Sequence, residues 1–193
     1  MPERRTPLDL SDANLAAQGL DALVRAIGEQ KGLPPVDRWH PTHCGDSGMR
    51  IARDGSWYHE GRLIRRDAMR RLFSTVLRRE SDGSHVLVTP VEKLSIEVES
   101  TPLFALQMTM EGEGQARRIA FALDRGDIVF ADADHPLIIV ETADGPSPRL
   151  RLDHGLEAEL ARPIYYELAE AAIAEGHEPP GIWSCGHFFA LSS

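Results

Sequence analysis

Beyond residue 91 the chain alternates short apolar segments with turns of glycine, proline and aspartate, and this spacing restricts the fold more than any other feature. Turn residues at such short intervals are typical of antiparallel strands. The pattern predicts seven strands and then a helix over residues 163–175, with Pro163 at its first position. This is the element order of a pleckstrin-homology-like barrel capped by a helix. The predicted strands are residues 91–99, 103–110, 117–123, 127–131, 136–142, 148–152 and 155–160.

The first half of the chain mixes helices with short strands. Helix-capping residues and helical apolar spacing predict one helix over residues 11–29 and another over residues 68–79. Between them, residues 39–48 are rich in proline, glycine and polar side chains, which predicts a loop. Residues 49–64 then predict three short strands joined by tight turns, the first of them at Asp54-Gly55.

The segment VLVTPVEKLSIEV, residues 86–98, is apolar and β-branched on both sides of Thr89-Pro90. A proline removes a donor from a strand ladder, so the segment predicts one strand, a kink and a second strand. The flanking residues 50–72 and 151–168 share an element order. In each, an arginine-bearing strand meets a glycine turn, a second strand follows, and an arginine opens an amphipathic helix. The order predicts an internal repeat.

The predicted fold class is therefore α+β, with a duplicated core of antiparallel strands and helices. The predicted units are residues 1–88 and residues 89–193, and the aromatic tail of the second unit is expected to pack back onto its body. A seam between two copies of a motif is a natural place for a ligand cleft.

Composition and charge narrow the function. The 193 residues are 42% hydrophobic, enough for a substantial core, and no apolar run is long enough to span a bilayer. The start of the chain has no apolar signal-peptide core, and two cysteines make no disulfide framework, so we expect a cytoplasmic protein. The net charge of -9 argues against broad nucleic-acid binding.

The charge is divided unevenly along the chain. Residues 1–90 carry 14 Lys and Arg against 12 Asp and Glu, whereas residues 91–193 carry 7 against 18. Arginines in the first part could clamp a small anion, and an indole face could stack on a base. We expect the cleft where the 39–48 loop, the 86–98 segment and the tail meet. The predicted ligand-binding residues are Trp39, Asp46, Arg50, Arg66, Glu92, Lys93 and Trp183.

No dinucleotide, P-loop, metalloprotease or serine-hydrolase motif occurs in the chain, so we predict no catalytic residue, and the sequence leaves the cofactor unknown. The triplet His40/His43/Cys44 and the pair Cys185/His187 have poor spacing for zinc, so no metal site is predicted. Two alternatives to a ligand-binding module stay open. One is an enzyme that uses Cys44 as a thiolate, or Asp46 or Glu92 as a hydrolytic carboxylate. The other is a protein-interaction adaptor without a small ligand.

Several segments carry a resemblance to a known family. They are PPV at 34–36, CGD at 44–46, MRIARDG at 49–55, W-Y-x-x-G at 57–61, RLFSTVLRRE at 71–80, VTPVEK at 88–93, ADADHPL at 131–137, ARPIYYEL at 161–168 and GIWSCGHFFAL at 181–191. With these segments in this order, the chain resembles, over about residues 34–191, the bacterial family known as domain of unknown function 1285.

That resemblance implies a duplicated α+β core whose second half is loosely similar to pleckstrin-homology folds. It also implies a binding site at the domain interface that accepts a nucleotide-like ligand, and a link to signal transduction. The family carries no assigned activity, so the resemblance supports the architecture more than the function.

Overall fold

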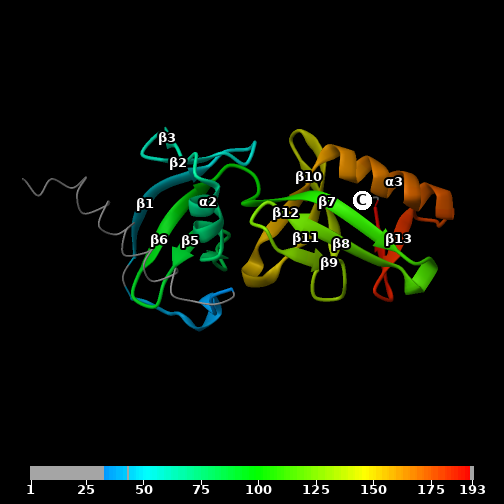
Figure 1. The fold of residues 1–193 in the computed structure, drawn as a ribbon, viewed down its shortest axis with the longest axis horizontal. Coiled ribbons are helices and arrows are strands. Elements are labelled where there is room, and N and C mark those ends of the chain that lie inside the picture. The colour runs from blue at the N-terminus through cyan, green and yellow to red at the C-terminus, as the bar shows by residue number, and fades with distance from the viewer. Residues whose placement is uncertain (1–32, 43, 192–193) are drawn as a thin grey trace, which may run out of the picture.

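The computed structural model describes residues 33–42 and 44–191, which form two units arranged along the longest axis of the molecule (Figure 1). Each unit is built on a six-stranded mixed sheet, and a separate two-stranded hairpin follows the second sheet. The helix predicted over residues 11–29 lies outside the described residues. No helix in the described ranges is long and apolar enough to cross a membrane.

The first sheet has the strand order β3-β2-β1-β6-β5-β4, with a parallel pair, β1 and β6, at its centre. The helix α2 (Asp67–Ser74) connects β3 to β4 and packs on the sheet, because the Phe73 ring stacks on Trp57 at 6.4 Å between centroids. A 3-10 turn, η1 (Val36–Arg38), precedes the sheet. The strands are β1 (Cys44–Ile51), β2 (Trp57–His59), β3 (Arg62–Leu63), β4 (Leu77–Arg79), β5 (His85–Val88) and β6 (Lys93–Val98).

Helix α2 is shorter than the sequence predicts, since it ends at Ser74 rather than near residue 79. The hydroxyl groups of Ser74 and Thr75 donate to the carbonyls of Arg71 and Leu72, each at 2.7 Å, and so terminate the helix locally. Residues 77–79 instead form β4, which pairs with β5. The sequence predicted a longer helix because Val76 and Leu77 are apolar at helical spacing, and both are buried although neither is in the helix. The arginines at 78 and 79 therefore do not lie at a helix end.

The strand, kink and strand predicted for residues 86–98 are present as β5 and β6. They form a hairpin whose turn is closed by Thr89, with the Glu92 amide donating to the Thr89 hydroxyl at 3.1 Å. Both strands belong to the first sheet, so a boundary at residues 88/89 falls inside that sheet. The chain leaves the first sheet after Val98 and enters the second at Leu103.

The second sheet has the order β10-β11-β12-β7-β8-β9, with β12 parallel to β7 at its centre. The predicted strands from residue 103 onward are present close to their predicted bounds, except that β11 begins at Gly145 rather than at residue 148. The predicted helix is also present, here as α3 (Arg162–Glu175). It packs through Ile164, Leu168 and Ala172. The strands are β7 (Leu103–Glu111), β8 (Arg118–Leu123), β9 (Ile128–Phe130), β10 (Leu137–Thr142), β11 (Gly145–Arg151) and β12 (Glu157–Leu160).

The pleckstrin-homology-like barrel is not confirmed. The described residues contain no closed barrel, because β9 and β10 are the two outer strands of an open sheet. The expected seven antiparallel strands become six in a mixed sheet. The first of the seven pairs with β5 and β1 in the other unit, and the last runs parallel to β7. Turn chemistry predicts where strands end but does not show which distant strand each one will pair with.

The duplication is confirmed at the level of sheet topology. Each sheet consists of two three-stranded meanders, and the first and last strands of the unit lie side by side in parallel. The correspondence differs from the predicted one, because residues 50–55 end the first strand of their unit whereas residues 151–155 end the fifth. The helices differ too, since α2 joins the two meanders and α3 follows both.

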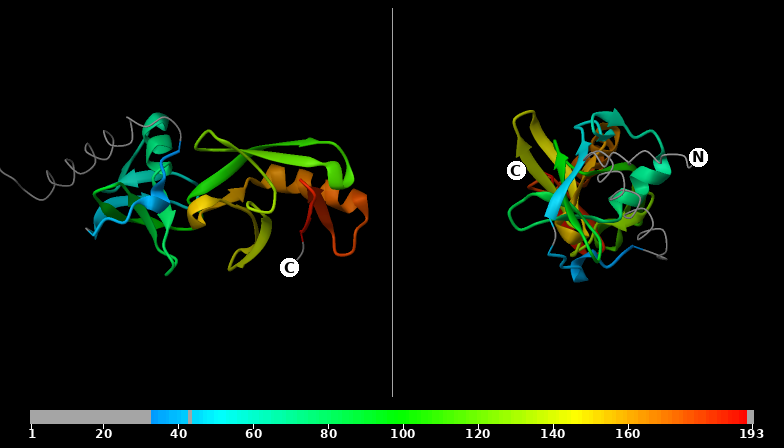
Figure 2. Two further views of the ribbon diagram at one scale, coloured as in Figure 1. Left: turned by 90° about the horizontal axis from the view of Figure 1, so that it is seen from below. Right: turned by 90° about the vertical axis from the view of Figure 1, so that its left-hand side faces the viewer.

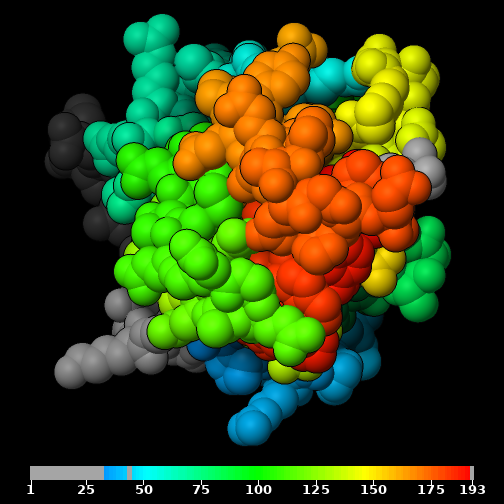
Figure 3. All heavy atoms as spheres, turned by 90° about the vertical axis from the view of Figure 1, so that its right-hand side faces the viewer, coloured from blue at the N-terminus to red at the C-terminus, as the bar shows by residue number. Residues whose placement is uncertain are grey.

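The tail forms the hairpin of β13 (Gly181–Ser184) and β14 (His187–Ala190), which packs on the second unit. The buried Ser184 hydroxyl accepts from the Ile119 amide at 3.0 Å and donates to the Ala131 carbonyl at 2.7 Å. Figure 3 shows α3, this hairpin and the β7–β8 strands closely packed on the same end of the molecule.

The two units meet along a seam that the chain crosses between Val98 and Leu103 (Figure 2). A single hydrophobic cluster includes buried residues of both units. Side chains also cross the seam: Asp37 contacts the His154 ring at 2.7 Å, Arg53 pairs with Asp144, and Arg79 lies 4.0 Å from Glu157.

Gly55, in the turn before β2, packs against the Phe104 ring across the seam. A β-carbon there would lie 2.9 Å from the Phe104 ring, in a backbone with φ of 80°. We expect Gly55→Ala to lower the free energy of unfolding by about 2–3 kcal/mol, because strain and overpacking add. The control is Gly61→Ala, whose φ is 76° but whose β-carbon would meet nothing within 4 Å. Equal losses in denaturant unfolding would show that the contact with Phe104 does not matter.

Candidate functional site

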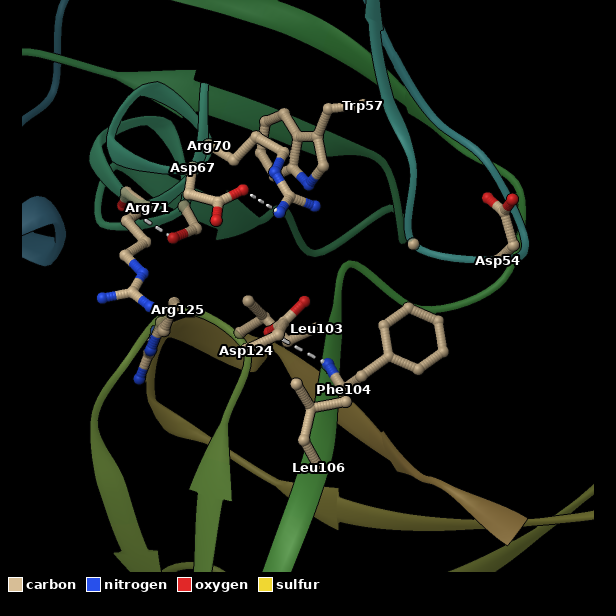
Figure 4. Close-up of a pocket in the computed structure, with 12 residues that line it drawn as sticks. Asp54, Trp57, Asp67, Arg70, Arg71, Leu103, Phe104, Leu106, Asp124 and Arg125 are labelled. Carbon is tan, nitrogen blue, oxygen red and sulfur yellow. Dashed lines mark hydrogen bonds and ion pairs between the residues drawn. The ribbon is translucent and has the colours of Figure 1, made fainter. Parts of the chain in front are cut away.

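A cavity of about 330 Å³ lies at the seam, between α2 of the first unit and the β7–β8 side of the second (Figure 4). It has charged groups from both units, which makes it a candidate ligand site, although a larger cavity beside Arg53, Asp144 and Arg149 also has charges from both units. Its lining is Asp54, Gly55, Trp57, Asp67, Arg70, Arg71, Ser74, Leu103, Phe104, Leu106, Asp124 and Arg125.

The first unit supplies one face of α2. Four cavity residues share one side of this helix, because they lie three, four and seven positions after the first of them. They are Asp67, Arg70, Arg71 and Ser74. Behind them the indole of Trp57 is buried and stacks on Phe73, which fixes how the helix sits on its sheet. The polar groups of α2 are therefore held on a packed element.

The second unit supplies the start of β7 and the tight turn between β8 and β9. The turn is closed by the Gly126 amide donating to the Leu123 carbonyl at 2.9 Å, with Gly126 at a φ of 103°. The Arg71 guanidinium reaches across to this turn, so that a β-carbon on Gly126 would lie 3.4 Å from it. Helix α2 and the β8–β9 turn thus meet at Arg71.

Two of the three arginines in the cavity already have carboxylate partners. Arg70 pairs with Asp67 on its own helix, and Arg125 makes a bidentate pair with Asp127, both contacts being 2.7 Å. Arg71 makes no ion pair and no side-chain hydrogen bond with any residue that the structure describes. None of its guanidinium donors is used within the described ranges, whereas Arg70 is ion-paired, with its buried Nε left without a partner there.

Asp124 is a half-buried acid of the cavity. One of its carboxylate oxygens accepts from the Phe104 amide at 3.2 Å. Burial raises the pKa of Asp124, and the Phe104 hydrogen bond and the charges of Arg70 and Arg125 only partly oppose this. No ion pair within the described ranges joins Asp124 to a cation.

The residues predicted as ligand-binding from the sequence lie elsewhere. Asp46 and Arg50 are brought together on β1, where both line a shallow hollow beside β6. Arg50 pairs with Glu99 and lies over the Tyr58 ring at 4.5 Å, so it is already engaged. The segment expected to be a loop up to residue 48 is strand from Cys44 onward, which places Asp46 in the sheet.

The remaining predicted residues are dispersed. Lys93 contacts Glu80 at 3.5 Å, and Glu92 lies in the β5–β6 turn. Arg66 is exposed at the start of α2 and lines a different hollow with the β2–β3 turn. Trp39 follows η1 beside β4, whereas Trp183 lies on β13 in the other unit, edge-on to Phe188. The two indoles therefore belong to different units and do not line the seam cavity.

Sequence reasoning missed Arg70, Arg71, Asp124 and Arg125. The sequence of α2 did indicate a charged surface, because its charged residues recur at helical spacing on the side away from the buried Phe73. Asp124 and Arg125 are indistinguishable by sequence from ordinary turn residues, and only the contact between the units places them near α2.

The two cysteines lie in different units. The described residues contain no group of three His, Cys, Asp or Glu side chains placed to hold a metal ion. Cys185 lies in the β13–β14 turn, where its amide donates to the Arg117 carbonyl at 2.8 Å, and Cys44 begins β1 in the other unit.

The comparisons identify the family. Residues 34–101 match the N-terminal domain of the domain of unknown function DUF1285, and residues 102–191 match its C-terminal domain. The chain belongs to the DUF1285 family. The two matches meet where the chain passes from the first sheet to the second.

Solved structures of the same family resemble the chain. A crystal structure of a DUF1285 family protein from Silicibacter pomeroyi DSS-3 has a TM-score of 0.82 and 39% identity, covering 91% of this chain and 95% of that one. A DUF1285 family protein from Shewanella baltica OS155 has a TM-score of 0.49 and 25% identity, covering 64% and 91%. No curated protein matches the chain.

Proposed function

We propose that the protein binds a small anionic ligand in the seam cavity. The supporting observation is Arg71, an arginine held on a packed helix, lining a cavity, with no carboxylate partner in the described ranges. A guanidinium has five N–H donors and binds carboxylate or phosphate through two parallel hydrogen bonds. Arg70 and Arg125 add positive charge from the same helix and from the other unit.

A nucleotide-like ligand fits this proposal. The anionic group would lie at Arg71, and an apolar or aromatic part would contact Phe104 and the exposed Leu106 at the start of β7. The cavity volume is at the small end of the range for ligand pockets, which favours a mononucleotide-sized molecule or part of a larger one.

A role in signal transduction follows from the position of the site. A ligand held by α2 on one side and by the β7–β8 side on the other would favour one relative orientation of the two units. A partner protein that distinguishes orientations would then respond to the ligand.

The adaptor alternative has its own supporting observation. Tyr166 and Ile173, seven residues apart on α3, expose 62% and 69% of their surface, so they form an outward apolar side of the helix. The alternative of an enzyme that uses Cys44 stays a prediction.

A thermal-shift panel of mononucleotides, cyclic nucleotides, dinucleotides and pyrophosphate tests the ligand-binding proposal. A ligand that binds only the folded protein adds about 2.7 kcal/mol of stability at a hundredfold excess over Kd. We expect Arg71→Gln to weaken a hit by about tenfold or more, since a hydrogen-bonded charge is lost.

Two variants serve as controls for Arg71→Gln. Arg151→Gln makes the same change at an exposed site that lines none of the cavities described above, and should leave affinity unchanged. Arg66→Ala tests the site predicted from the sequence. A hit abolished by Arg66→Ala and indifferent to Arg71→Gln would move the site away from the seam. Silence across the whole panel would favour the adaptor.

A further inference from the structure

Away from its exposed rim, the seam cavity has one cation and one anion that form no ion pair within the described ranges. Arg70 forms an ion pair with Asp67, and Arg125 forms one with Asp127, so the charges within each pair cancel. Asp54 lies at the exposed rim, and its carboxylate accepts from the Ser56 amide at 2.9 Å. Arg71 and Asp124 remain, one a cation and one an anion. The cavity therefore has an unpaired group for each end of a dipolar ligand.

Asp124 has acceptor capacity that the protein does not use. An ionised carboxylate offers about four lone-pair sites. The carboxylate accepts from the Phe104 amide at 3.2 Å and also interacts with the Arg125 backbone amide, which leaves lone-pair sites unused. In Figure 4 the carboxylate lies among Asp67, Arg70 and Phe104. The side chain is half-buried, and its burial raises the pKa of Asp124. A hydrogen-bond donor from a ligand would offset that burial.

A ligand that is only an anion would not meet this need. Its charge would be attracted by Arg71 and repelled by the Asp124 carboxylate in the same small cavity. An ammonium group on the same ligand would reverse the second effect, because a cation favours the ionised carboxylate.

Building on the anion-binding function proposed above, we infer that the seam cavity selects amino-bearing anions, with Arg71 binding the anionic group and Asp124 the ammonium group. The substrate class is thus a small zwitterion, or a larger molecule that presents an anion and an amine close together. Asp124 is the residue that determines this specificity.

A matched pair of probes tests the inference without any variant. Ethyl phosphate and phosphoethanolamine share the phosphate and the two-carbon chain and differ by one ammonium group. Calorimetric titration of the full chain at neutral pH should show phosphoethanolamine binding about tenfold or more tightly, as one charge-assisted hydrogen bond allows. Equal affinity of the two probes, or tighter binding of ethyl phosphate, overturns the inference and leaves anion binding intact.

Variants then assign the preference to its residue. Asp124→Asn keeps an acceptor for the Phe104 amide and removes the charge, so it should abolish the preference while ethyl phosphate binds at least as well as before. Asp134→Asn, an exposed aspartate outside the cavity, should keep the preference. Arg71→Gln should weaken both probes alike. A preference that survives Asp124→Asn overturns the role of Asp124, whereas failure of both probes to bind the wild type counts against the proposed function itself.

Discussion

Replacing Arg78 by methionine is expected to lower the free energy of unfolding by about 3 kcal/mol. The Arg78 side chain is 13% exposed and donates to the Val36 carbonyl at 2.9 Å, the Trp39 carbonyl at 3.0 Å and Glu80 at 2.8 Å. Methionine keeps the apolar stem but leaves these acceptors without their donor. The segment around Trp39 should then detach from β4, which denaturant unfolding followed by tryptophan fluorescence can measure.

Arg79→Met is the matched control, because Arg79 is the next residue, is 43% exposed and lies 4.0 Å from its acidic neighbour Glu157. It should change stability by less than about 1 kcal/mol, as exposed ion pairs do. Similar losses at both positions would contradict the role given to Arg78.

The Arg78 variant should also change the response to acid. Burial alone would raise the pKa of Glu80, but the hydrogen bond and charge of Arg78, together with Lys93, hold it below the usual value of 4.5. A carboxyl with a lowered pKa in the folded state stabilises the fold above the unfolded pKa, and this contribution is lost as pH falls through the folded pKa. In Arg78→Met the loss of stability below pH 4.5 should be smaller than in the wild type.

The second large effect is expected at Gly181, the first residue of β13. A β-carbon there would lie 2.5 Å from the Phe188 ring and 2.5 Å from the Phe189 carbonyl oxygen. The carbonyl belongs to the paired strand and cannot move without breaking the hairpin. We expect Gly181→Ala to destabilise the protein by about 3 kcal/mol or to release the β13–β14 hairpin from the second unit.

Gly186→Ala gives the comparison within the same hairpin. Its β-carbon would meet nothing within 4 Å, so only the left-handed backbone, with φ of 78°, opposes the change, at about 1 kcal/mol. Thermal unfolding and hydrogen exchange of the β13 amides distinguish the two. A Gly181→Ala protein as stable as the Gly186→Ala protein would show that the hairpin shifts to make room.

Local chemistry determined which parts of the fold could be predicted. The strands from residue 103 onward were predicted because glycine, proline and aspartate terminate each one within the sequence itself. The parallel pairs β1–β6 and β12–β7 were not, since nothing near Cys44 indicates that Lys93 lies beside it. The end of α2 at Ser74 was not predicted either, because the strand that follows it, β4, is stabilised by pairing with β5.

The place of the candidate site could not be predicted from the sequence, and its ligand stays a proposal. The seam between units was expected to hold arginines and an anion, and the seam cavity does contain Arg70, Arg71 and Arg125. The residues chosen from the sequence were those in polar or glycine-bearing segments, such as Asp46, which lies within β1. The seam brings Arg71 next to Gly126, and such contacts between distant residues leave no local pattern in the chain.

The parallel centre of each sheet has a mechanical consequence. Because β1 and β6 run the same way, the start of β1 and the end of β6 lie at opposite ends of the pair, and the same holds for β7 and β12. Tension applied to a unit through these strands would act along them, so the hydrogen bonds between them would be loaded together in shear rather than opened one at a time. Each unit should therefore resist stretching more strongly than a meander pulled from its edge.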